Sequence, residues 1–145
     1  MKKPVQAEFV FLVYPEQRSR LHVRVLVYWT VADLRRAMRE VRGRCDTSGV
    51  LGFCRGVLVR TTQGRTRPVF AEIGLTFSSR TTVITHEAFH ATCRWAARRK
   101  LAPLSFTLPG ADVKGQSLIE ERLAEAHDAI CRGIVHNLYR LNVLK

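Results

Sequence analysis

Two histidines and a glutamate in the middle of the chain have the spacing of a metal-dependent hydrolytic site. The run reads His86-Glu87-Ala88-Phe89-His90. On a helix, residues four apart lie one turn apart on the same face, with Cβ atoms roughly 5–6 Å from each other. Both imidazoles can then reach one zinc ion at roughly 2.0–2.1 Å, and Glu87 can take a proton from a water bound to that ion. The spacing therefore indicates a zinc site, one ion per chain, with its own general base.

A third protein ligand is expected from the C-terminal part of the chain, because catalytic zinc takes three protein ligands and keeps a fourth position for water. Glu121, Glu125 and Asp128 are spaced i, i+4 and i+7, so they share one helix face. We expect that face to meet the metal helix. Glu121 would then be the third ligand, and Glu125 or Asp128 would accept the second N–H of a ligand histidine. Glu120, His127 and Asp128 are the alternatives as third ligand.

The two segments together resemble the zincin metallopeptidases of the gluzincin type. The resemblance covers about Val69 to Ile130 and rests on His86-Glu87-x-x-His90 followed by Glu121-x-x-Ala124-Glu125. It implies a zincin-like fold and a protein or peptide substrate, bound in extended form along the strand Val69–Phe77. Carried over by position, it assigns the following roles: ligands His86, His90 and Glu121; general base Glu87; helix-packing residue Ala124; histidine-orienting acid Glu125.

The first half of the chain predicts strands and one helix. Residues Gln6–Tyr14 and Leu21–Trp29 are rich in β-branched and aromatic side chains, which favours two strands paired as a hairpin. Thr30 can cap a helix from Val31 to about Arg42 whose apolar stripe is Val31, Leu34, Met38 and Val41. Gly43 is expected to end this helix.

The second half predicts two more strands followed by two helices. The strands are Gly56–Thr61 and Val69–Phe77, joined by a turn at 62–65, and the metal helix runs from about Thr82 to Arg99. Residues 101–115 contain prolines and glycines, so they predict an extended loop. Ser117 and Glu120 fit a capping box, after which a last helix reaches about Leu141.

This β-β-α-β-β-α-α order predicts an α+β fold. We expect one zincin-like domain over residues 1–145, in which a short, mostly antiparallel sheet packs on the metal helix and the C-terminal helix.

A strong positive charge is the second functional signal. The formal net charge is +12, and nineteen of the 24 cationic residues are arginines. Such a surface attracts nucleic acid or acidic protein segments. It supports an alternative function, a basic nucleic-acid- or protein-binding module with a zincin-like fold and a largely structural zinc. Trp95, flanked by arginines, would then stack on bases, although a buried core tryptophan is the simpler interpretation.

The four cysteines give an indication of the cellular compartment. Cys45, Cys54, Cys93 and Cys131 contain no CxxC pair, so they predict reduced thiols in a cytoplasmic protein. Cys93 lies three residues after His90 and could be a metal ligand, or else a thiol of the core. No apolar run reaches the roughly 18–20 residues that a membrane span needs.

Overall fold

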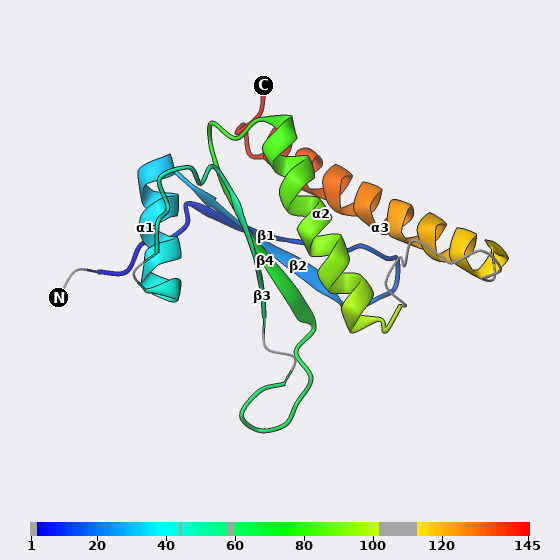
Figure 1. Ribbon diagram of the computed structural model, residues 1–145. Helices are drawn as coiled ribbons and strands as arrows, with labels where there is room; N and C mark the ends of the chain where they lie inside the picture. The colour runs from blue at the N-terminus through cyan, green and yellow to red at the C-terminus, as the bar shows by residue number, and fades with distance from the viewer. Residues whose placement is uncertain (1–2, 44, 58–59, 102–112) are drawn as a thin grey trace.

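The structure is a computed structural model that describes residues 3–43, 45–57, 60–101 and 113–145, with the backbone alone for 113–117 (Figure 1). The predicted element order and the α+β class are confirmed. The elements are β1 (Phe9–Val13), β2 (His22–Tyr28), α1 (Val31–Arg42), β3 (Phe53–Gly56), β4 (Val69–Thr76), α2 (Thr81–Arg98) and α3 (Val113–Arg140).

The four strands form one mixed sheet in the order β1-β2-β4-β3. The hairpin of β1 and β2 is antiparallel, as predicted, and so is the pair of β3 and β4. The central pair, β2 and β4, is parallel. This pair departs from the simplest antiparallel arrangement because the chain returns through α1 and β3 before it forms β4, and a crossover of this length permits parallel pairing.

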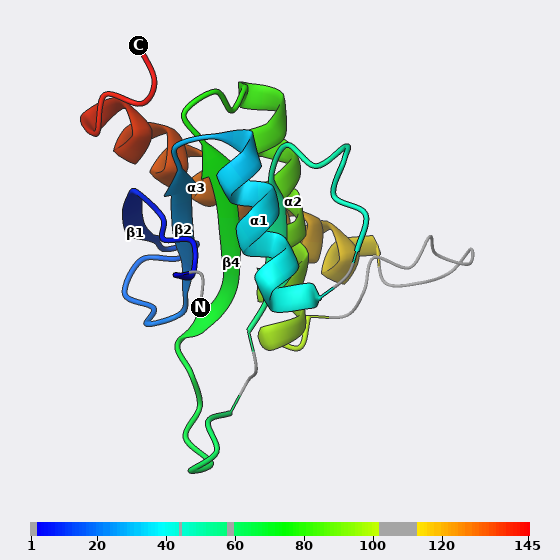
Figure 2. The ribbon, with the colours of Figure 1, turned by 90° about the vertical axis from the view of Figure 1, so that its left-hand side faces the viewer.

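Helices cover both faces of the sheet (Figure 2). Val23, Val25 and Val27 point to one face, where they are fully buried together with residues of α2 and α3 such as Trp95 and Ile130. On the other face, α1 covers a smaller apolar cluster: Tyr28, Leu34, Ala37 and Phe53. The predicted packing of the sheet on the helix that contains His86 and on the C-terminal helix is thus confirmed.

The predicted bounds of α1 are confirmed, and its caps explain them. Thr30 Oγ1 accepts a hydrogen bond from the Asp33 amide at 3.1 Å, and Gly43 has a φ of 75°, which glycine adopts at low cost. The predicted apolar stripe is only partly right. Leu34 is buried, whereas Val41 is 60% exposed.

The third strand lies earlier than predicted. β3 is Phe53–Gly56 rather than Gly56–Thr61, because burial of the Phe53 ring against α1 determines where the strand pairs. The chain beyond it still turns back as predicted. Arg60 pairs with Thr66, and Gly64 has a φ of 77° in the turn.

Helix α3 begins earlier than predicted. Its first residue is Val113, so Ser117 lies inside the helix and the predicted capping box is wrong. The expected loop at 101–115 lies mostly outside the described residues. Gly133 does not interrupt the helix. Instead, it lets α3 approach β1, because a Cβ atom there would lie 2.5 Å from Val13 Cγ1.

Candidate metal and catalytic site

Helix α2 presents the two histidines to solvent because its opposite side is apolar. Ile84, Ala88 and Trp95 are buried against the sheet and α3. His86 and His90 lie on the other side of the helix and are exposed. The amphipathic pattern of α2 therefore determines the orientation of the histidine pair.

The two imidazoles converge on one point. His86 Nε2 and His90 Nε2 are 3.1 Å apart, and the rings meet edge to face with centroids 4.7 Å apart. A tetrahedral zinc ion separates two imidazole nitrogens by roughly 3.3 Å when each Zn–N bond is roughly 2.0–2.1 Å. The pair fits two positions of such an ion with little side-chain movement. The same spacing permits an Nε2–H···Nε2 hydrogen bond between the two rings.

Glu87 differs from its histidine neighbours because it is buried. The residue is only 7% exposed, and burial raises the pKa of its carboxyl, while His86 and His90 oppose this rise. Together with His86 it lines a cleft of about 380 Å³ that also involves residues 49–52 and the start of α2. A carboxyl with a raised pKa beside a cleft is suited to general acid–base chemistry.

The loop before β3 forms the other wall of this cleft. Gly52 comes so close to α2 that an added Cβ atom would lie 2.7 Å from Val83 Cγ1 and 3.2 Å from Glu87 Cγ. No motif in the sequence predicts that residues 49–52 belong to the site. Gly52 is the local signal, because the absence of a side chain lets this segment lie close against the side chains of α2.

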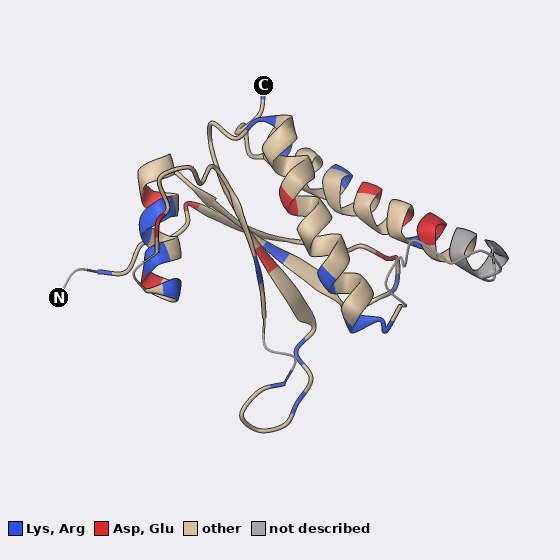
Figure 3. Cartoon of the chain, viewed as in Figure 1, with Lys and Arg blue, Asp and Glu red and all other residues tan. Residues whose placement is uncertain are grey.

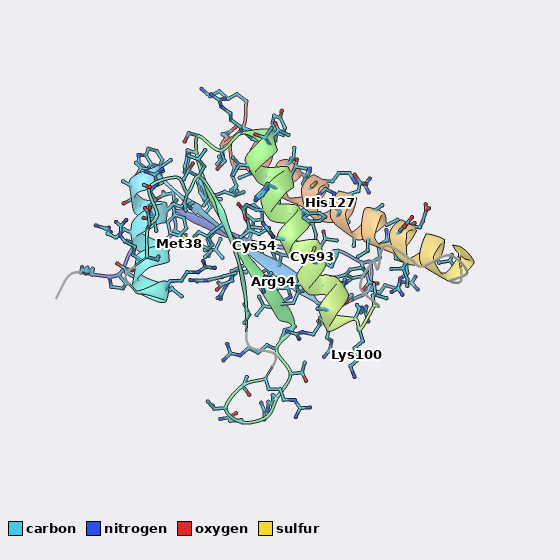
Figure 4. All side chains as sticks on the ribbon, in the orientation of Figure 1. Met38, Cys54, Cys93, Arg94, Lys100 and His127 are labelled. Atoms are coloured by element: carbon cyan, nitrogen blue, oxygen red, sulfur yellow. The ribbon has the colours of Figure 1, made fainter. Side chains whose placement is uncertain are left out.

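His127 of α3 lies against α2 (Figure 4). Its Nε2 is 3.3 Å from the Thr85 carbonyl oxygen and 3.6 Å from Cys131 Sγ. His127 and His86 both line a pocket of about 520 Å³ with Phe89. The sequence predicts His127 only as an alternative third ligand.

The three carboxylates of α3 do share one face, as their spacing predicts, but that face does not meet α2. Glu121, Glu125 and Asp128 are all exposed, and Asp128 pairs with Arg132 at 2.8 Å. The expectation that they face the metal helix is therefore corrected. The reason is the apolar stripe on the opposite side of α3, which decides which face is buried: Ala126, Ile130, Ile134 and Leu138.

No third ligand joins the histidine pair in the part of the chain that the structure describes. Among those residues, no group of three or more His, Cys, Asp or Glu side chains could hold a metal ion. Glu120 is exposed, and Glu125 lines a separate pocket with Glu16 and Trp95. The assignment of Glu121 as third ligand stays a prediction that rests on the resemblance.

The remaining candidates are Trp95 and two of the cysteines. Trp95 is 1% exposed, so it belongs to the core and is not a stacking platform. Cys93 is exposed on α2, so its prediction as a thiol of the core is wrong. Cys54 faces the same side of the sheet as α2, and burial raises the pKa of its thiol to about 11. Such a thiol is a poor metal ligand at neutral pH.

The expected peptide-binding strand is also corrected. Strand β4 has β2 on one side and β3 on the other, so its backbone is already paired along both edges. The sheet edge on the side of the cleft belongs to β3, whose outer backbone groups have no neighbouring strand among the described residues. An added strand would therefore pair with β3 rather than β4.

Comparisons with known proteins add no relative. No family model, no curated protein and no solved structure matches the chain. None of the described helices is both long enough and apolar enough to span a membrane.

Proposed function

We propose that the chain is a zinc-dependent peptide hydrolase with a zincin-like arrangement of sheet and metal helix. The observation that carries the proposal is the convergence of His86 Nε2 and His90 Nε2, 3.1 Å apart, beside a buried Glu87 whose pKa is raised by burial. His86 and Glu87 line one cleft between α2 and residues 49–52, and His90 lies one turn further along α2.

His86 and His90 would hold the zinc, and one donor from α3 would complete the site. When bound, the ion supplies Lewis acidity, which polarises a carbonyl group and makes a water molecule more acidic. Among the α3 donors, His127 is favoured because it lines the same pocket as His86. Glu121 has the support of the resemblance only.

Glu87 would move the proton. Its carboxylate oxygen takes a proton from the attacking water and later gives it to the leaving amine. Burial favours this exchange because it brings the carboxyl pKa closer to neutral, where the group gains and loses protons with similar ease. Gly52 and Val83 form the walls of the cleft beside Glu87.

The free edge of β3 is the place for an extended substrate. Its backbone N–H and C=O groups are available for pairing, and the strand follows directly on the cleft residues 49–52. A peptide added here would run beside α2, which packs against β3. Backbone pairing provides affinity without a sequence requirement, and side-chain pockets add selectivity.

The replacement Glu87→Gln tests the proposal. In a zinc-loaded protein assayed with a mixture of quenched fluorogenic peptides, we expect turnover to fall at least about 100-fold, while zinc remains bound. Glu8→Gln, the same chemical change at an exposed residue just before β1, is the matched control and should keep its activity. If wild type and Glu87→Gln release peptide products at the same rate, the hydrolase proposal is wrong and the alternative, a basic module with a structural zinc, is favoured.

A further inference from the structure

The turn between β3 and β4 is a two-stranded projection that carries three arginines. Figures 1 and 2 show it extending away from the sheet and helices. Within residues 60–67, here called the basic ribbon, Arg60 pairs with Thr66 and the Thr61 amide donates to the Arg65 carbonyl at 2.8 Å. Arg60 and Arg65 are exposed, and Arg67 is half-buried.

The two strands of the basic ribbon place cations on both of its sides. Residues that face each other in a pair point to the same side, so Arg60 shares a side with Thr66. Successive residues of an extended chain alternate, so Arg65 and Arg67 point to the other side. The ribbon can therefore contact anionic groups on its two sides at once.

The C-terminal end of α2 continues this basic surface. Arg98 donates to the Arg67 carbonyl at 2.7 Å and to the Val69 carbonyl at 3.4 Å, which joins the helix to the base of the ribbon. Arg94 and Lys100 are exposed beside it. Together with Arg98 they line a pocket of about 350 Å³ whose described lining contains no acidic side chain. Figure 3 shows the cations on both elements.

These cations are not neutralised within the described structure. The six ion pairs among the described residues use other arginines, for example Arg24 and Arg55 with Glu72, and Arg99 at the end of α2 with Glu16. The cations without a carboxylate within 4.0 Å, among the described residues, include Arg60, Arg65, Arg67, Arg94, Arg98 and Lys100. The positive charge is therefore available to an external anion.

The described residues of this surface include no exposed aromatic side chain, which bears on the kind of nucleic acid it could bind. Single-stranded nucleic acid is held by aromatic side chains on which bases stack. The large hydrophobic side chains exposed in the described structure include Tyr14, Trp29, Phe89 and Tyr139, and none of them belongs to the basic ribbon or the end of α2. Guanidinium groups without aromatic partners suit the phosphates of a duplex.

We infer that the basic ribbon and the C-terminal end of α2 form a binding surface for duplex DNA. The major groove of B-form DNA is about 12 Å wide and admits a two-stranded ribbon, whereas that of duplex RNA is too narrow for side-chain access. Arg60 and Arg65, on opposite sides of the ribbon, contact phosphates of the two strands. Arg94 and Lys100 contact the backbone beside the groove, and Arg98 positions the ribbon.

The test is fluorescence anisotropy of the full chain with a labelled 20-base-pair DNA duplex, from 50 to 200 mM salt. The triple variant R60Q/R65Q/R67Q is expected to bind at least about tenfold more weakly, with a salt slope reduced by about 1.8 for the lost phosphate contacts of Arg60 and Arg65. R94Q/K100Q, which leaves the ribbon unchanged, should lower the slope by about 1.8. A matched control, R36Q/R42Q/R140Q, removes the same charge at exposed sites on α1 and α3 and should bind within about threefold of wild type.

Three results would overturn the inference: no salt-dependent binding of the duplex by the wild type, equal weakening by the two triple variants, or tighter binding of single-stranded DNA, duplex RNA or poly-glutamate of the same length. The surface contains neither His86, Glu87 nor His90. Glu87→Gln is thus expected to bind DNA like the wild type, and failure of the DNA inference is distinguishable from failure of the proposed hydrolase.

Discussion

Helices α2 and α3 both carry donor side chains at intervals of three or four residues, but the two sets meet different surroundings. On α2, the Nε2 atoms of His86 and His90 lie 3.1 Å apart, next to the buried Glu87. On α3, Glu121, Glu125 and Asp128 share a face that is exposed to solvent. The spacing determines which side chains share a face. The apolar residues on the rest of the helix determine whether that face borders a site or the solvent.

The largest difference between the two helices should appear in zinc affinity. Loss of one converging imidazole removes a ligand, so His86→Ala is expected to weaken zinc binding at least about 100-fold. Asp128→Ala on the exposed face of α3 should change the affinity less than about twofold. Competition with a chromophoric chelator measures both. Equal effects of the two substitutions would show that the face of α3 also reaches the metal.

The two faces of α3 should differ in their effect on stability. At Gly133, which touches Val13 of β1, an alanine Cβ would overpack the contact, and we expect Gly133→Ala to lower the free energy of unfolding by about 1–3 kcal/mol. Asp128→Ala on the exposed face should stay within about 0.5 kcal/mol of wild type. Urea unfolding of both variants provides the comparison. A neutral Gly133→Ala would mean that α3 does not approach β1 this closely.

Two substitutions on α3 can show which of its side chains is the third zinc ligand. If the third ligand comes from the side that shares a pocket with His86, His127→Ala should weaken zinc binding roughly tenfold. Glu121→Ala should then leave zinc affinity within about threefold of wild type. The reverse order would restore the assignment that the resemblance implies, and would require α3 to turn about its axis when zinc binds.

The smallest expected effect concerns Glu87 in the metal-free protein. Burial raises its folded-state pKa above the ordinary value of 4.5, so the neutral carboxyl is favoured on folding. The stability associated with this group is fully present below pH 4.5 and is lost as the pH rises through the raised pKa. Glu87→Gln should therefore melt at the same temperature as wild type near pH 4 and a few degrees higher at pH 7. A lower melting temperature at pH 7 would mean that the ionised carboxylate is stabilised instead.

The sequence predicts the elements well where a local signal exists. Thr30 and Gly43 mark the ends of α1, and the spacing of His86 and His90 predicts a shared face. The start of α3 and the position of β3 were wrong because they depend on distant contacts. The ring of Phe53 has to pack under α1 before β3 can be placed, and no local pattern reports that contact.

The candidate site was predictable only in part for the same reason. The histidine pair and Glu87 lie within five consecutive residues, so one helix is enough to place them together. The third ligand depends on how α3 is rotated about its axis, which is determined by burial of Ile130 and Ile134 against the rest of the core. The wall of the cleft at Gly52 depends on a close approach between segments more than thirty residues apart in the sequence.

X-ray absorption at the zinc edge tests most directly whether His86 and His90 hold a zinc ion. The protein is purified with zinc and analysed for metal content. We expect about one zinc per chain, bound by at least two imidazole nitrogens at roughly 2.0–2.1 Å. In H86A/H90A this signal should be lost. A chain without bound zinc would contradict the account. So would a zinc ion coordinated by sulfur at roughly 2.3 Å.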